Sequence, residues 1–219
     1  MISVIIPTLN EAEHLPVALE KIRANSAAHE IIVADGGSGD ATLQIAAGAR
    51  AKVICSDKPG RSLQMNAGAK AANGEIFLFL HADTQLHDFN LEQIAGALKN
   101  ERVCGGGFAR RFDSDSLFLR ATCSLATWRS RHFGLFLGDQ GIFVRREIFE
   151  RLGGFKEMTA FEDVDFSRRL ARSGKTVMLQ PAVISSARRF EKRGPFLTTC
   201  RDLWLAVKYA TGLENYSAK

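Results

Sequence analysis

The sequence predicts an α/β domain with a mostly parallel, Rossmann-like central sheet flanked by helices. Over the first hundred residues, short apolar or β-branched runs alternate with helical stretches of about nine to twelve residues. This alternation is typical of right-handed βαβ units on a parallel sheet. The runs are apolar at successive positions, as expected for strands that helices cover on both faces.

The elements of the first half follow one another in a regular order. Strands are expected at 4–6, 31–34, 53–55 and 76–80, and helices at 14–25, 41–49, 61–72 and 90–99. Asn10 and Glu13 have the spacing of a capping box for the first helix, and Asp88 or Asn90 can cap the fourth.

The second half is less regular. A glycine-kinked strand is expected at 105–112, further strands at 141–145 and 176–186, helices at 115–131, 146–152 and 162–172, and a last amphipathic stretch at 196–212. No internal repeat, low-complexity tract or linker separates the halves. Residues 1–219 are therefore expected to form one domain, with a change of role near residue 100.

Charge is distributed unevenly along the chain. Residues 1–100 carry 8 basic and 11 acidic side chains, whereas residues 101–219 carry 21 and 13. The second half has 16 arginines against five lysines, and arginine recognises oxyanions geometrically. This excess predicts an anionic partner such as phosphates, a lipid headgroup or nucleic acid, and the plain alternative is an ordinary basic surface.

The cysteine pattern and the hydropathy favour a cytoplasmic protein. The four cysteines show neither C-x-x-C spacing nor clustering with histidine, which disfavours a zinc site and a disulfide framework. Met1 runs directly into an apolar strand, without the basic region of a signal peptide. The longest apolar runs, such as 76–80, are about five residues long, against the ~18 that cross a bilayer.

Polar or glycine-rich loops follow all four expected strands of the first half, at 7–11, 35–40, 57–61 and 81–84. In open α/β sheets, ligands bind beyond the carboxyl ends of the strands. One such loop is an ordinary turn, but four that converge on one edge predict a ligand site.

Two of these loops offer groups for a nucleotide. Asp35 can accept hydrogen bonds from ribose hydroxyls or a base edge, and Gly36 lets the backbone come close. Lys58 and Arg61 stand where they could meet phosphates, and Arg61 begins a helix whose amides add positive potential.

Further groups are expected near the same ligand. On the Arg61 helix, Asn66 and Gly68 would offer a side-chain amide and a close backbone approach. Asp83 follows the fourth strand, and its carboxylate suits Mg²⁺ or Mn²⁺ bridging a diphosphate. His81 is either a second metal ligand, a phosphate donor or a hydrogen-bonded structural histidine.

Together and in order, these motifs resemble those of the family 2 glycosyltransferases, which have the GT-A fold. The resemblance spans nearly the whole chain and is greatest to a short stand-alone branch associated with radical-SAM and selenodomain proteins. It rests on Pro-Thr-Leu-Asn-Glu at 7–11, Asp-Gly-Gly-Ser at 35–38, the 61–68 helix, His-Ala-Asp at 81–83, Gly-Asp-Gln-Gly at 138–141 and Glu-Asp at 162–163.

The resemblance implies a role for each matching position. Asp83 matches the last carboxylate of the Asp-x-Asp signature, which holds the divalent ion, and His81 stands at its first position. Asp163, beside Glu162, matches the base that activates the acceptor. The implied nucleotide, sugar and acceptor contacts are Pro7, Thr8, Asn10, Glu11, Asp35, Gly36, Lys58, Arg61, Asn66, Gly68, His81, Ala82, Gly138, Asp139, Gln140, Arg188 and Arg189.

The implied reaction moves a sugar from a nucleoside diphosphate donor to an acceptor hydroxyl, with inversion and help from a divalent metal. Residues 1–100 would bind the donor nucleotide, and residues 101–219 the acceptor. An inverting transfer needs a base for the hydroxyl and a cation for the departing diphosphate, which Asp163 and Asp83 with Arg188 or Arg189 can meet. The segment 186–190 differs from the Gln-x-x-Arg-Trp of processive relatives, which disfavours polymer synthesis.

Other functions remain open at this point. A catalytically inactive nucleotide-binding homologue would share the same motifs. The 35–39 segment also matches the D-x-G-x-G of methyltransferases, with Asp57 as the ribose-binding acid, but that interpretation leaves Asp83 and Asp163 without a role. A nucleic-acid binder is not expected, because no array of aromatics interleaves with the arginines.

The C-terminal stretch combines an apolar stripe with basic residues. Phe196, Leu203, Trp204 and Val207 recur at helical spacing, beside Arg189, Lys192, Arg193, Arg201 and Lys208. Such a helix either lies on an anionic bilayer or packs on the sheet or a partner subunit, as in a homodimer. The first alternative predicts a cytoplasmic enzyme at the inner membrane face that acts on a lipid-linked acceptor.

Overall fold

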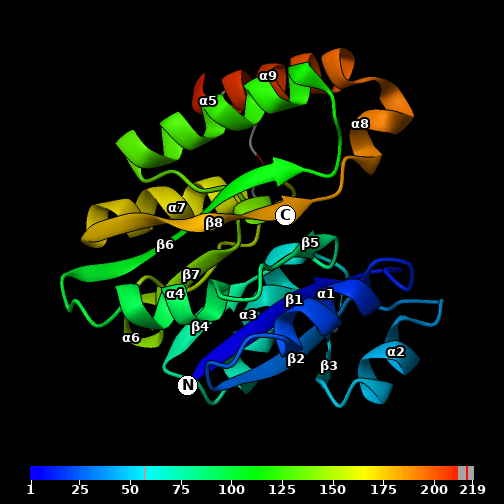
Figure 1. The fold of residues 1–219 in the computed structure, drawn as a ribbon, viewed down its shortest axis with the longest axis vertical. Helices are drawn as coiled ribbons and strands as arrows, with labels where there is room; N and C mark the ends of the chain where they lie inside the picture. The colour runs from blue at the N-terminus through cyan, green and yellow to red at the C-terminus, as the bar shows by residue number, and fades with distance from the viewer. Residues whose placement is uncertain (57, 212–215, 217–219) are drawn as a thin grey trace.

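A computed structural model describes residues 1–56, 58–211 and 216. Within this part of the chain, eight strands form one mixed sheet in the order β3-β2-β1-β4-β7-β6-β8-β5 (Figure 1). The strands are β1 (Ile2–Thr8), β2 (His29–Asp35), β3 (Lys52–Cys55), β4 (Ile76–Phe79), β5 (Thr84–Gln85), β6 (Val103–Phe112), β7 (Ile142–Arg145) and β8 (Lys175–Ser185).

The helices fall close to their expected positions. They are α1 (Leu15–Arg23), α2 (Thr42–Gly48), α3 (Arg61–Ala71), α4 (Asn90–Ala97), α5 (Leu117–Phe133), α6 (Arg146–Arg151), α7 (Glu162–Ser173), α8 (Arg188–Arg193) and α9 (Pro195–Thr211), with a short 3-10 turn, η1 (Gly138–Gln140). The sequence did not predict α8 or β5, which have only six and two residues, too few to show a period.

The sheet is parallel in its first half and mixed in its second. Strand β1 lies between β2 and β4, and both pair with it in parallel, so that Ile5 faces Ile32 on one side and Phe79 on the other. Strand β7 pairs antiparallel with β4 and with β6, which joins the two halves into one sheet. The sheet is therefore parallel over β1 to β4, as expected, whereas β7 and β5 pair antiparallel with their neighbours.

Both faces of the sheet are covered by helices, as the apolar strands predicted. Val4 and Ile6 point into a core with α1, α2 and α4, whereas the intervening Ile5 points into a second core with α3, α6 and α7. This alternation follows from the two-residue period of a strand.

Two expected helix caps are wrong, because loop contacts take the side chains instead. Helix α1 begins after His14 without a side-chain cap. Asn10 has a left-handed φ of 57°, and its Oδ1 accepts a hydrogen bond from the Gly39 amide at 2.9 Å. Asn90 Oδ1 accepts from the His87 amide at 2.6 Å rather than capping α4.

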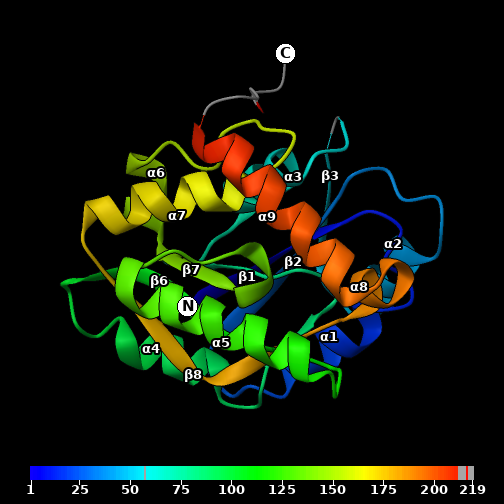
Figure 2. The same cartoon turned by 90° about the horizontal axis from the view of Figure 1, so that it is seen from above.

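Helices α5 and α9 lie together at the top of the molecule in Figure 1; α5 packs against β6, and Figure 2 shows that the two helices converge at their N-terminal ends and diverge toward their C-terminal ends. Their Phe118 and Phe196 ring centroids are 6.2 Å apart. A small third core joins α5 to β6 and α8 through Phe112, Leu119 and Phe190.

Candidate active site

The loops after β1 and β2 are tied together by hydrogen bonds around the buried Asp35. Its Oδ1 accepts from Thr8 Oγ1 at 2.9 Å and from Ser38 Oγ at 2.5 Å, and its Oδ2 accepts from the Gly37 and Ser38 amides at 2.8 and 2.7 Å. Burial alone would raise the pKa of Asp35, but these hydrogen bonds outweigh it and hold the pKa below its ordinary value. Asp35 therefore holds the loop in shape as a carboxylate whose acceptor positions are filled.

A buried glutamine of α3 completes this junction. Gln64 Nε2 donates to the carbonyl oxygens of Thr8 and Ala34, at 2.6 and 2.9 Å. A Cβ at Gly36 would lie 3.0 Å from the same nitrogen, so glycine leaves room for this side chain. The sequence analysis missed Gln64; its signal is a polar residue on the face of α3 that meets the sheet.

Arg188 of α8 bridges two carboxylates from different loops. Its Nη2 donates to both oxygens of Glu11, at 2.8 and 3.0 Å, and lies 3.2 Å from Asp83 Oδ2. The bonds to Glu11 and the charge of Asp83 raise the pKa of Arg188. Burial, reinforced by the Glu11 charge, raises the pKa of Asp83, and Arg188 offsets part of that increase. Two facing carboxylates thus share one cation.

The residues around Asp83 fit an ion that takes most of its ligands from a bound diphosphate. Among the described residues, His, Cys, Asp and Glu side chains form no group of three or more suited to an ion. Mg²⁺, however, is commonly held by one or two carboxylates together with substrate phosphates. Asp83 with Glu11 supplies that pair, and Arg188 shows that the two carboxylates already attract a cation.

His81 and Asp163 meet at Gly138. The Gly138 amide donates to Asp163 Oδ2 at 2.7 Å. A Cβ on Gly138 would overlap His81 Nε2 and lie 3.5 Å from Asp163 Oδ2, so both side chains border the same point. Burial and the nearby Arg61 lower the pKa of His81 to about 4, which leaves its imidazole neutral at pH 7. The ring nitrogen Nε2 is buried without a hydrogen-bond partner.

Two adjacent carboxylates begin α7 in this place. Burial raises the pKa of Asp163, and the amides of Gly138 and Val164 and the charge of Arg61 offset only part of the rise. Burial also raises the pKa of Glu162, which is 4% exposed and pairs with Arg61 Nη1 at 3.1 Å. The preceding Phe161 has a left-handed φ of 65°, an uncommon conformation for a non-glycine residue that is found at functional sites.

Behind η1 lies a buried ion pair that the sequence analysis missed. Arg110 of β6 binds Asp139 Oδ2, and the Arg110 guanidinium lies 4.5 Å from the ring centroid of Phe112. Its signal is that Arg110 shares the inward face of β6 with Phe108 and Phe112. Arg110 Nε and Asp139 Oδ1 are buried without partners. Three of the four such side-chain atoms in the described chain, with His81 Nε2, therefore surround η1.

Several expected contact residues have structural partners instead. Asn66 donates to the Phe155 carbonyl at 2.8 Å and accepts from its amide at 3.0 Å. Gly68 packs against Ile5, and Ala82 is part of the buried core. Gln140 is fully buried; its amide donates to the Phe108 carbonyl and accepts from Arg129. These four positions make contacts within the protein, and their contact with a substrate stays a prediction.

Three further residues that were expected to contact the ligand lie at the margins of the candidate active site. Pro7 pairs with Ala34 at the end of β1. Lys58 is exposed, and its carbonyl accepts from Ser56 Oγ at 2.7 Å. Arg189 pairs with Asp202 of α9, although its charge also contributes to the low pKa of His81. Asp57 lies outside the described residues.

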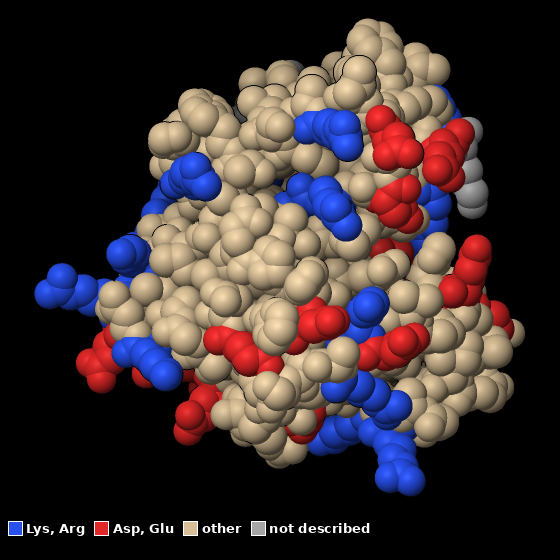
Figure 3. All heavy atoms as spheres, viewed as in Figure 1, with Lys and Arg blue, Asp and Glu red and all other residues tan. Residues whose placement is uncertain are grey.

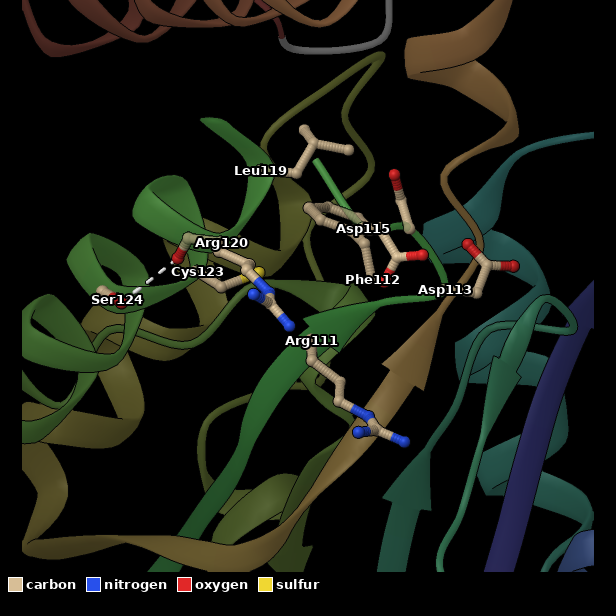
Figure 4. Close-up of a pocket in the computed structure, with 9 residues that line it drawn as sticks. Arg111, Phe112, Asp113, Asp115, Leu119, Arg120, Cys123 and Ser124 are labelled. Carbon is tan, nitrogen blue, oxygen red and sulfur yellow. Dashed lines mark hydrogen bonds between the residues drawn. The ribbon is translucent and has the colours of Figure 1, made fainter. Parts of the chain in front are cut away.

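A cavity of about 450 Å³ opens beside the Arg110 strand (Figure 4). Segment 111–115 forms one side of it, and α5 forms the other with Leu119, Arg120 and Cys123. Asp113 Oδ1 accepts from the Ala187 amide at 2.6 Å, which connects this wall to the start of α8.

Comparisons with known proteins agree with this geometry. The profile of Glycosyl transferase family 2 matches residues 3–153. A PGL/p-HBAD biosynthesis glycosyltransferase from Mycobacterium bovis is 32% identical over 191 residues, which cover 77% of this chain and 69% of the relative. Glycosyltransferase AglE from Haloferax volcanii is 26% identical over 206 residues, covering 84% of this chain and 65% of AglE.

Solved structures share the fold. TarS from S. aureus, residues 1–349, superposes with a TM-score of 0.71 at 18% identity, covering 85% of this chain and 60% of that one. Mannosyltransferase PcManGT from Pyrobaculum calidifontis, solved with GDP-Man and Mn²⁺, gives a TM-score of 0.71 at 21% identity, covering 84% and 56%. The chain thus spans less than two thirds of AglE and of these solved chains.

The fold is the GT-A fold, and the family profile and the relatives show that the protein is a glycosyltransferase. More narrowly, the chain belongs to glycosyltransferase family 2. The predicted fold class and family are confirmed, and the match supports nucleotide-sugar glycosyl transfer over the methyltransferase interpretation of the 35–39 loop.

Proposed function

We propose that this chain moves a sugar from a nucleoside diphosphate donor to an acceptor hydroxyl with inversion, and that Asp163 is the general base. In this proposal residues 1–100 bind the nucleotide and residues 101–219 the acceptor. The observation that carries it is the half-buried Asp163 carboxylate, which accepts from the Gly138 amide beside the unpartnered Nε2 of His81. Buried polar atoms without hydrogen-bond partners are rare in native proteins. The three such atoms that surround η1 therefore support the binding of a polar ligand there.

Asp163 has the position and electrostatics that proton transfer requires. It takes the proton from the acceptor hydroxyl as that oxygen bonds to the anomeric carbon and the bond from this carbon to the diphosphate breaks. Burial raises its pKa toward the operating pH, which makes the carboxylate a better base. Its hydrogen bonds from the Gly138 and Val164 amides fix its direction.

The departing diphosphate needs positive charge. Arg61 lies at the start of α3 with more than half of its side chain exposed, and Arg188 stands between Glu11 and Asp83. Either guanidinium can donate hydrogen bonds to the phosphate oxygens, since the planar donor fork of arginine is suited to phosphate. Mn²⁺ or Mg²⁺ at Asp83 and Glu11 would neutralise charge on the same diphosphate, a role supported by the Mn²⁺ in the mannosyltransferase structure.

The acceptor side is the basic second half of the chain. The 111–115 cavity lies on that side of the sheet and carries Arg111 and Arg120. A lipid-linked acceptor, met at the cytoplasmic face of the inner membrane, would account for the exposed apolar stripe of α9. Contact of α9 with a second copy in a homodimer is the alternative.

A thermal-shift screen of nucleotide sugars with and without Mn²⁺ tests the donor class. Solved relatives hold UDP-GlcNAc and GDP-Man, so uridine and guanosine diphosphate sugars come first. Stabilisation by one of them supports the proposal because a ligand that binds only the folded state raises its stability. Stabilisation by S-adenosylmethionine alone, or by no nucleotide, contradicts it.

The metal role is tested separately with Asp83→Ala. This variant should abolish the Mn²⁺-dependent part of the stabilisation by the nucleoside diphosphate while the protein remains folded. If the full Mn²⁺ effect persisted, Asp83 would not be the residue that holds the metal ion.

A further inference from the structure

Exposed apolar side chains are concentrated on two helices. Among the residues that the structure describes, 14 large hydrophobic side chains are exposed, and ten of these lie on α5 or α9. We call these ten the α5–α9 surface; they are Leu117, Phe118, Leu125, Trp128, Phe133, Phe196, Leu197, Leu203, Trp204 and Val207. Single exposed hydrophobics are ordinary, but a contiguous patch marks an interaction site.

The N-terminal halves of the two helices bring several of these side chains together. On α5, Leu117, Leu125 and Trp128 follow a helical stripe, and Phe196, Leu203 and Val207 do so on α9. A shallow apolar groove of about 280 Å³ runs between them, lined by Phe118 and Leu125 on one side and Phe196 and Leu203 on the other. In Figure 3 this edge, at the top, is covered largely by uncharged residues.

Both tryptophans of the chain lie on this surface. Trp128 and Trp204 are 53% and 57% exposed, and the chain has no third tryptophan. Tryptophan is costly to expose in water and is enriched where a protein meets the headgroup region of a membrane. Lys208 Nζ lies 3.8 Å from the ring centroid of Trp204, which places an ammonium beside the apolar stripe.

The charge around the surface is basic. Helix α5 contains three arginines and no acidic residue, and Arg120 and Arg131 are exposed. On α9, Arg201 is exposed, and the acidic Asp202 is paired with Arg189. Arg193 adds a further exposed positive charge at the end of α8, while Glu191 of α8 and Asp115 before α5 are exposed acidic residues beside this rim. An apolar centre with a basic rim is complementary to an anionic bilayer.

We propose that the α5–α9 surface docks this protein onto an anionic lipid bilayer through both helices. A second copy suits the surface poorly, because a two-fold interface buries the same patch from both subunits and would gather the exposed Arg120, Arg131 and Arg201 of both copies around one interface. The chain lies on the bilayer rather than crossing it, since no helix in its described part has the length and apolar character to span one.

Docking would fix the active site relative to the bilayer. Helix α8, which carries Arg188, leads directly into α9. Further along α9, Tyr209 stacks on Phe161, with ring centroids 4.9 Å apart. Phe161 immediately precedes Glu162 and Asp163 in the sequence. The inward face of α9 thus contacts the catalytic loop while its outward face meets lipid. This arrangement would favour an acceptor presented at the membrane surface, a consequence that rests on the proposed transfer.

Vesicle co-sedimentation of the full chain tests the docking without any sugar substrate. We expect sedimentation with vesicles of phosphatidylcholine and phosphatidylglycerol at low salt, little with phosphatidylcholine alone, and loss at high salt. The double variant Trp128→Ser, Trp204→Ser should weaken binding by about tenfold or more, and Arg131→Gln, Arg193→Gln, Arg201→Gln should remove most of the lipid-charge dependence. Phe89→Ser is the matched control, since Phe89 is 61% exposed but lies outside the surface.

The outcomes separate this proposal from its alternatives. No binding to anionic vesicles, or binding that both multiple variants retain, overturns it. A dimer in solution that the tryptophan variant dissociates assigns the surface to a second copy instead. The thermal shift with nucleotide sugars is measured on the same proteins: it should survive the surface variants, so failure of docking and failure of the donor proposal are distinguishable.

Discussion

The loops at the ends of β1 and β2 and the η1–α7 region both carry buried carboxylates, but the pKa shifts of their carboxylates have opposite directions. Asp35 accepts four hydrogen bonds from its own surroundings, which hold its pKa low. Asp163 is half-buried and has a raised pKa, beside unpartnered atoms of His81 and Asp139. The first arrangement stabilises the fold, whereas the second costs stability until a ligand arrives.

This difference indicates where chemistry takes place. A carboxylate with a satisfied hydrogen-bond shell is a poor base, because its charged form is already stabilised. A carboxylate whose pKa is raised by burial binds a proton more readily and is stabilised more by a polar ligand. In the proposed reaction the preformed loops would hold the donor nucleotide, and the η1–α7 region would carry the proton transfer.

The largest expected effect is at Asp163. Asp163→Asn is nearly isosteric but cannot accept the proton, so turnover should fall by ~10²-fold or more while donor affinity is kept. Release of nucleoside diphosphate, with water or an added acceptor as nucleophile, measures turnover, and the thermal shift reports donor binding. Asp165→Asn is the control, since Asp165 lies on the same helix turn but pairs with Arg169 and Lys156. Near-normal turnover in Asp163→Asn would pass the role to Glu162.

A smaller loss is expected at Gly138. In Gly138→Ala the new Cβ would overlap His81 Nε2 and displace the amide that orients Asp163. Because small misplacements of reacting groups are costly, we expect turnover to fall by about tenfold or more. Gly39→Ala has no heavy atom within 4 Å of its new Cβ and should leave turnover unchanged. Equal turnover in both variants would show that the contact at η1 is unimportant.

The preformed loop should respond in stability rather than in catalysis. Ser38→Ala removes a donor to Asp35 and the acceptor for the Asn10 amide. We expect the free energy of unfolding to fall by about 1–2 kcal/mol, with kcat nearly unchanged. Denaturant unfolding and steady-state kinetics on the same protein check both parts. A large loss of kcat without a loss of stability would reverse the roles that we assign to the two regions.

The sequence predicted the fold better than it predicted contacts within the site. Periodicity and apolar runs locate β1 to β4 and α1 to α4, because burial on both faces dictates their residues. Gln140 was expected to contact substrate, but nothing local shows that its amide is buried against β6 and α5. The Arg188–Glu11 pair joins residues 177 positions apart, and only the folded chain reveals it.

The pH dependence of kcat/KM shows whether Asp163 is the general base. Asp163 must be ionised to act as a base, so activity should fall with decreasing pH through its raised pKa, above the ordinary value of 3.8. We expect an acidic limb in the wild-type profile that is lost or displaced in the residual activity of Asp163→Asn; Asp83 and Glu162, whose pKa values are also raised, add to this limb in both proteins. An acidic limb that Asp163→Asn retains unchanged would contradict the assignment of Asp163 as the base.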